Sequence, residues 1–126
     1  MINLEQLRAA AALDFWRQNQ NANQGQDGGN VVSKLPSLII NNGLLATLAF
    51  AKDKSGGHQA LALAVVQFLA RPEVGVIPRP AGSLHGEGPL DPFIGVLTAN
   101  DSIVLQRATS ESLAFLAYLK RFAPGD

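Results

Sequence analysis

Apolar residues recur at helical spacing in every long segment of this chain, and no long segment alternates apolar with polar residues. Positions i, i+3, i+4 and i+7 share one face of an α-helix, whereas a half-buried strand requires strict alternation. Short stretches rich in Gly, Pro and Asn separate these segments and interrupt regular structure. The pattern predicts a single all-α domain over residues 1–126, built as a compact bundle of about five or six helices.

Capping signals mark where several of these helices begin. Asn3 is followed three residues later by Gln6, which is the spacing of a capping box. Asp91 directly precedes a proline, and Asp101 precedes the last long apolar segment, so both are expected to cap helices. Glycines 56 and 57 also precede a segment with helical spacing.

Two segments have a composition that disfavours regular structure. Residues 18–30 are polar and contain glycine, and residues 75–92 contain four prolines and four glycines. Such stretches have too few apolar side chains to offset the entropy lost on ordering. We expect flexible loops over residues 18–30 and about 75–90.

The stretch "PSLIINNGLLATLAF" has apolar flanks but Asn41, Asn42 and Gly43 in its centre. It could form a hairpin turned by Asn-Gly, two helices, or one helix. A hairpin requires alternating flanks, which are absent, and helical spacing favours one helix over about residues 36–51. Gly43 would lie in its apolar stripe and let another helix cross closely, and Asn42 would point inward and need hydrogen-bond partners.

Composition excludes several classes of protein. Ten lysines and arginines balance ten aspartates and glutamates, so nucleic-acid binding would need a local basic patch. There is no cysteine, which excludes disulfides and thiolate zinc sites. Charged residues interrupt the N-terminal apolar stretch, and no run approaches the roughly 18 apolar residues of a membrane span. A cytoplasmic protein without membrane contact is expected.

No set of residues has the spacing of a catalytic, metal or cofactor site. The "HGE" stretch at His85 echoes zinc deaminases, but those also require a Cys-x-x-Cys pair. His58 stands near the start of a helix, where a surface position is expected. The stretch "KDKSGG" contains the letters of a phosphate-binding loop in the wrong order, and the aspartates lack paired spacing. We therefore expect no enzyme and no cofactor.

Two longer motifs resemble the small all-α subunit of the type III-B CRISPR effector, the Cmr complex. The first is "KLPSLIINNGLLATLAFAKDK" and the second is "RATSESLAFLAYLKRFA". The residues that carry the likeness are Leu35-Pro36, Asn42-Gly43-Leu44, Phe50 with Lys52 and Lys54, Arg107-Ala108-Thr109, and Leu119-Lys120-Arg121-Phe122-Ala123.

This resemblance implies a non-catalytic subunit for antiviral defence. In the family, small subunits stack on one another beside the crRNA-binding backbone and help to line the groove for target RNA. The implied partners are the backbone and large subunits of the complex, copies of the chain itself, and crRNA or target RNA.

The last helix offers a candidate contact face. Arg107, Glu111, Ala114, Tyr118 and Arg121 form one stripe, apart from an expected core stripe of Leu105, Ala108, Phe115, Leu119 and Phe122. The first stripe is either a solvated face with an Arg107–Glu111 pair or a contact face for RNA or a neighbouring subunit. The candidate contact residues are Arg107, Tyr118, Lys120, Arg121, Lys52 and Lys54.

Two other functions remain open. A helical scaffold or oligomerisation protein without RNA contact would show the same alanine-rich helical faces. A small ribonuclease or deaminase is disfavoured, because the chain lacks a recognisable set of acid and base residues.

Overall fold

The structure, a computed structural model, describes residues 2–23, 30–54, 56–78 and 88–124, and it confirms the all-α fold. The described residues form six helices and no strand. The helices are α1 (Leu4–Gln18), α2 (Val31–Asn42), α3 (Leu44–Asp53), α4 (Gly57–Leu69), α5 (Asp91–Ala99) and α6 (Ser102–Phe122).

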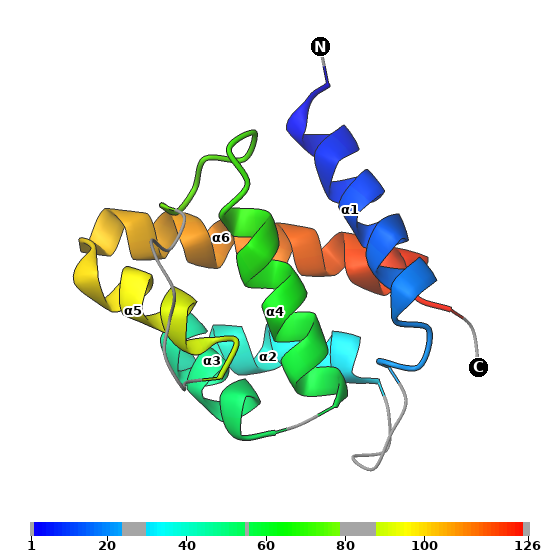
Figure 1. The fold of residues 1–126 in the computed structure, drawn as a ribbon, viewed down its shortest axis with the longest axis horizontal. Helices are drawn as coiled ribbons and strands as arrows, with labels where there is room; N and C mark the ends of the chain where they lie inside the picture. The colour runs from blue at the N-terminus through cyan, green and yellow to red at the C-terminus, as the bar shows by residue number, and fades with distance from the viewer. Residues whose placement is uncertain (1, 24–29, 55, 79–87, 125–126) are drawn as a thin grey trace.

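The longest helix, α6, runs across the molecule and organises the others around it (Figure 1). α1 packs against its C-terminal half, α4 crosses it, and α2 also packs against it. α5 and α3 lie at the end of the molecule where α6 begins, and they contact one another. Because α3 also packs on α2 and α4, the surface formed by α2, α3 and α4 is continuous.

Aromatic residues join the helices in the core. Phe68 of α4 and Phe115 of α6 stack with 4.3 Å between their ring centroids and 8° between their planes. Trp16 of α1 is buried, and its indole Nε1 donates a 2.8 Å hydrogen bond to the carbonyl oxygen of Leu119. A buried indole N–H needs such a partner, so this bond fixes α1 to the last turns of α6.

Two of the three predicted caps are confirmed. Asn3 and Gln6 exchange side-chain to backbone hydrogen bonds of 2.8 and 2.9 Å, which complete the capping box of α1. Asp101 accepts from the backbone amides of Ile103 and Val104, each at 3.1 Å, and so caps α6. The third prediction is wrong, because Asp91 is the first residue of α5 and not its N-cap. Its carboxylate accepts a 2.8 Å hydrogen bond from the Gly88 amide.

The prediction of one helix over residues 36–51 is wrong, because two helices meet at Gly43. The Gly43 amide donates to Ile39 and closes α2, while the Gly43 carbonyl accepts from the amide and hydroxyl of Thr47 and opens α3. The backbone of Gly43 has φ +92° and ψ 160°. Residues that carry a Cβ rarely adopt these backbone angles, so glycine is needed for the break.

The predicted roles of Asn42 and Gly43 in a close helix crossing are wrong as well. Asn42 is exposed, so it needs no buried partner. A Cβ placed on Gly43 would meet no atom within 4 Å. Glycine is therefore required here by the backbone angle and not by a neighbouring helix.

α2 begins five residues before the predicted start and contains Pro36. Its first residues, Val31 and Val32, are buried. Asn30, at the N-cap, has φ +59° and makes no side-chain capping bond. The Val32 amide instead donates a 2.9 Å hydrogen bond to the side chain of Asn23, which lies nine residues earlier. This remote cap explains why the start of α2 has no local signal.

The described ends of the two expected loops make contacts with the bundle. Asn23 accepts from the Asn30 amide at 2.7 Å. Ile77 is buried, and its amide donates a 3.3 Å hydrogen bond to the Leu69 carbonyl. Residues 24–29 and 79–87, with His85 among them, lie outside the described residues, so the flexibility of these loops stays a prediction.

Candidate functional site

The middle of the predicted contact stripe on α6 is covered by α1. Glu111 is buried and accepts two hydrogen bonds from the Arg8 guanidinium, from Nε at 2.6 Å and from Nη2 at 2.7 Å. Glu111 thus pairs with Arg8, and not with Arg107 as in the solvated-face alternative. Hydrogen bonding to Glu111 raises the pKa of Arg8 above its ordinary value, so the guanidinium stays charged throughout the range in which proteins fold.

Tyr118 is partly covered by the same helix. Its hydroxyl donates a 3.1 Å hydrogen bond to the carboxylate of Glu5 on α1. Partial desolvation, together with this bond, raises the pKa of Tyr118. The ring centroid of Phe122 lies 6.3 Å away. Tyr118 is thus half-buried, with its hydroxyl already bound to α1.

The cationic residues of α6 remain on the surface. Arg107, Lys120 and Arg121 are exposed. Phe122, expected in the core stripe, is 37% exposed, while Ala108, Phe115 and Leu119 of that stripe are buried. The last turn of α6 therefore presents two cations beside an exposed ring.

Lys52 and Lys54 lie at the end of α3 and have different surroundings. The Lys52 ammonium lies 2.7 Å from the Asp91 carboxylate and so joins α3 to α5. The Lys54 ammonium lies 5.5 Å from the centroid of the Phe50 ring. This position is within the range of a cation–π interaction.

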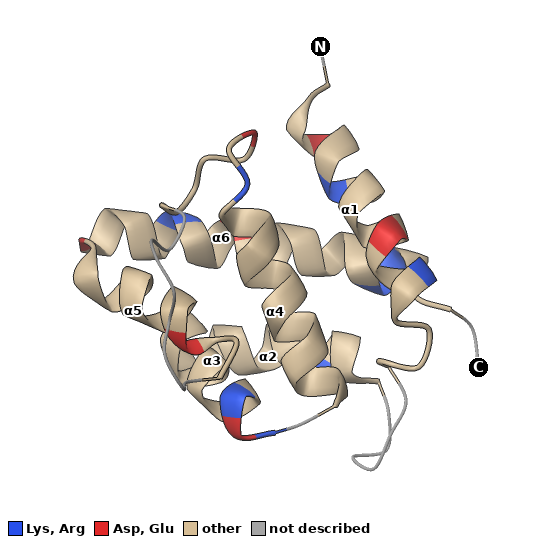
Figure 2. Ribbon diagram, in the orientation of Figure 1, with Lys and Arg blue, Asp and Glu red and all other residues tan. Residues whose placement is uncertain are grey.

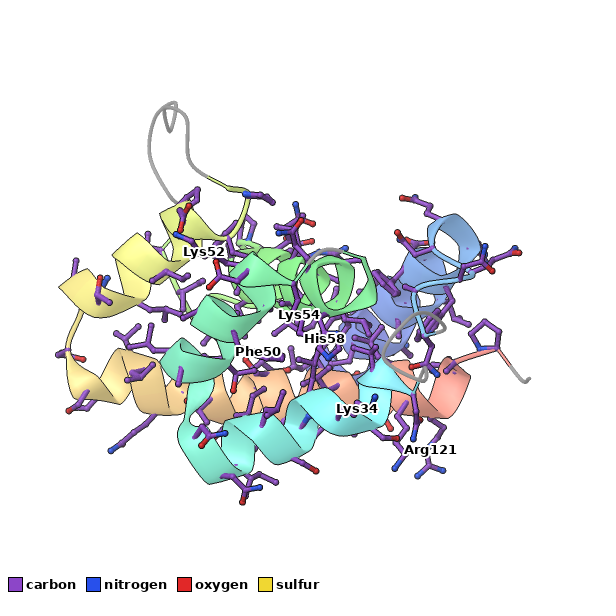
Figure 3. The ribbon with its side chains drawn as sticks, turned by 90° about the horizontal axis from the view of Figure 1, so that it is seen from below. Lys34, Phe50, Lys52, Lys54, His58 and Arg121 are labelled. Carbon is purple, nitrogen blue, oxygen red and sulfur yellow. The ribbon has the colours of Figure 1, made fainter. Side chains whose placement is uncertain are left out.

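The structure does not gather the predicted contact residues into one patch. Lysine and arginine residues are distributed over several helices and mixed with acidic residues (Figure 2). Lys52 and Arg121 lie toward opposite ends of the molecule (Figure 3). The candidates therefore divide into a group on α6 and a group at the end of α3.

A groove that the sequence did not reveal lies between α2, α3 and the start of α4. It has a volume of about 540 Å³. We call it the α2–α3 groove, and its lining residues are Ser33, Lys34, Ser37, Leu38, Asn41, Phe50, Lys54 and His58. Figure 3 labels Lys34, Phe50, Lys54 and His58, which come from three helices and their ends.

His58 lies buried in this groove, with 4% of its surface exposed, so the surface position expected for it is wrong. Its ring meets the Phe50 ring edge-on, at 5.5 Å between centroids and 81° between planes. Phe50 itself is 41% exposed. The imidazole therefore supports one side of an aromatic ring that is partly exposed to solvent.

The described residues contain neither a metal-site geometry nor a membrane-spanning helix. No group of three or more His, Cys, Asp or Glu side chains there could hold a metal ion. Within the same part of the chain, no helix has the length and apolar character to cross a membrane.

Comparison with known families shows the family of this chain. The model of the family described as CRISPR-associated protein (Cas_Cmr5) matches residues 4–126, a range that contains all six helices. The chain belongs to this family. It is a small subunit of the Cmr, or type III-B, complex. None of the curated proteins and none of the solved structures gives a significant match.

The two motifs that resemble the Cmr small subunit lie on separate parts of the fold. The first spans α2 and α3 with the break at Gly43, and the second lies on α6. α2 and α6 pack against each other. The Cmr family motifs are thus adjacent in the folded subunit although about 50 residues separate them in the chain.

Proposed function

We propose that this Cmr subunit is non-catalytic, stacks with neighbouring subunits that include its own copies, and helps to line the groove that binds crRNA and target RNA. The family match over residues 4–126 carries this proposal. The proposed location is the cytoplasm, and the proposed partners are the backbone and large subunits of the complex.

Exposed apolar side chains support contact with other subunits. Ile40 is 70% exposed, Ile2 is 63% exposed and Ile103 is 55% exposed. Exposure of large apolar side chains to water is unfavourable, and covering them with a partner lowers the free energy of the assembly. They lie on α2, at the N-terminus and on α6, so more than one face can meet a neighbour.

Exposed cations support contact with RNA. Arg107, Lys120 and Arg121 project from α6 without cover from α1. Several carboxylates instead stabilise the fold: Glu111 binds Arg8, and Asp101 caps α6. Residues used in this way are not available for acid–base chemistry, which favours a binding role over a catalytic one.

The test combines Arg107→Ala with Arg121→Ala in the assembled complex. Binding of a cationic side chain to a phosphate releases a counterion, so removing one such side chain should flatten the slope of log K against log salt by roughly 0.7 for single-stranded RNA. We expect weaker target-RNA binding, a slope smaller by about 1.4, and normal incorporation of the subunit. Tyr118→Ala should also weaken either RNA binding or assembly.

The matched control removes two positive charges elsewhere, through Arg17→Ala with Arg71→Ala. This variant should keep the wild-type salt slope. If the α6 variant and Tyr118→Ala assemble normally and bind target RNA as tightly as wild type at low salt, the subunit is a scaffold without RNA contact through α6.

A further inference from the structure

The α2–α3 groove is basic in a chain whose charges balance. The whole chain has ten lysines and arginines and ten aspartates and glutamates. Among the described residues, Lys34 and Lys54 line the groove, and no carboxylate does. Two ammonium groups from different helices create a local positive potential that attracts an anionic ligand.

The groove also presents an aromatic platform. Phe50 is 41% exposed, whereas Phe68 and Phe115 are 1% exposed. The buried His58 ring supports Phe50 edge-on, with 5.5 Å between the centroids. A supported aromatic ring next to cations is the arrangement on which unpaired bases stack.

The wall formed by α2 supplies neutral hydrogen-bonding groups. Ser33, Ser37 and Asn41 are spaced four residues apart, so they follow one face of the helix and line the groove together. Hydroxyl and amide groups can both donate and accept, which suits ribose hydroxyls and base edges. None of these groups selects strongly for one base.

From these features we infer that the α2–α3 groove binds one unpaired nucleotide of single-stranded RNA. The base stacks on Phe50, and Lys34 and Lys54 bind the flanking phosphates. The inference rests on the proposed function and identifies which feature of the RNA the subunit holds. It requires an unpaired nucleotide, because a base stacked within a duplex has no free face for Phe50.

The position of Lys54 suggests how the site opens. In the structure its ammonium lies 5.5 Å from the Phe50 centroid. A lysine side chain is flexible and has three N–H donors, so the ammonium can leave the ring for a phosphate. The ring face that it leaves is then accessible to the base.

The experiment compares Phe50→Leu with Phe50→Tyr in the assembled complex. Leucine keeps an apolar side chain but removes the stacking surface, whereas tyrosine keeps it. The probes are single-stranded RNA targets that carry one 5-iodouridine, moved along the sequence and photo-crosslinked to the subunit. We expect a crosslink at Phe50 in wild type, its loss in Phe50→Leu, and retention of affinity in Phe50→Tyr.

Affinity gives a second measurement. Removing one base–aromatic stack should weaken target-RNA binding about 5- to 150-fold. Lys34→Gln should also weaken target-RNA binding and should flatten its salt dependence. Arg17→Gln, with the same change in charge, should do neither. A pre-formed RNA duplex should bind equally to wild type and to Phe50→Leu.

The outcomes separate this inference from the function on which it rests. If a complex without the subunit binds target RNA as tightly as the complete complex, the proposed function fails. If the subunit contributes to affinity but Phe50→Leu matches wild type, only the groove assignment fails. If Phe50→Leu prevents incorporation of a normally folded subunit, the groove is a protein interface, and the nucleotide assignment is overturned.

Discussion

Glu111 is a charged side chain inside a helical bundle, and its burial depends on Arg8. The two side chains are 8% and 21% exposed and make two parallel hydrogen bonds. Charge-assisted, bidentate bonds of this kind are the strongest that side chains form. The pair therefore attaches α1 to α6.

Glu111→Ala should destabilise the subunit by about 2 kcal/mol, because it leaves the Arg8 charge partly buried without its acceptor. Denaturant unfolding of the isolated chain measures this loss. The control is Arg17→Ala, which removes an exposed pair with Asp14 whose side chains are 74% and 61% exposed. That variant should lose less than about 0.5 kcal/mol. Equal losses in the two variants would show that the buried pair contributes no more than a surface pair.

Gly43 and Gly95 have similarly open surroundings but different backbone angles. A Cβ on either residue meets no atom within 4 Å, but only Gly43 has a positive φ, of +92°. Gly43→Ala should therefore cost about 1–3 kcal/mol of unfolding free energy. Gly95→Ala, inside α5, should stabilise by up to about 1 kcal/mol through helix propensity. Stabilisation by both substitutions would mean that the chain does not need glycine to end α2.

At the scale of single helices, α2 depends on a residue outside itself. Asn23 accepts from the Val32 amide at 2.9 Å and replaces the local cap that Asn30 does not provide. Asn23→Ala should destabilise the chain by about 1 kcal/mol, the usual cost of losing an N-cap. The exposed Asn21 gives the control, and Asn21→Ala should leave the melting temperature unchanged. If both variants melt like wild type, the start of α2 frays without cost.

Much of the helical content was predictable, because its signals are local. The Asn3–Gln6 box and the Asp101 cap lie within three residues of the amides that they bind. The break at Gly43 was not predictable from apolar spacing, since both helices continue the same periodic pattern and only a backbone angle separates them. The early start of α2 was hidden because its cap comes from nine residues upstream.

The candidate surfaces were less predictable than the helices. Spacing along α6 placed its contact candidates on one helix, but it could not show that α1 covers Glu111 and Tyr118. The partners Arg8 and Glu111 are 103 residues apart. The α2–α3 groove combines side chains from three segments, and no periodicity within one segment reports such a combination.

At the scale of the whole molecule, exposed apolar and cationic side chains lie on more than one surface. Its charges balance, it exposes isoleucines on different elements, and some of its cations lie on α6 and others line the α2–α3 groove. A neutral subunit with local basic surfaces is suited to a site within an assembly, where other subunits cover its apolar faces. Two separate cationic surfaces would let one subunit contact RNA at more than one point.

The central claim is that this Cmr small subunit contributes directly to the target-RNA groove. The measurement that tests it most directly is the Kd of the assembled type III-B complex for single-stranded target RNA, with and without the subunit, over a series of salt concentrations. We predict that omission of the subunit raises the Kd and flattens the salt dependence, because fewer cationic side chains then bind RNA phosphates. An unchanged Kd and an unchanged salt slope would contradict the claim.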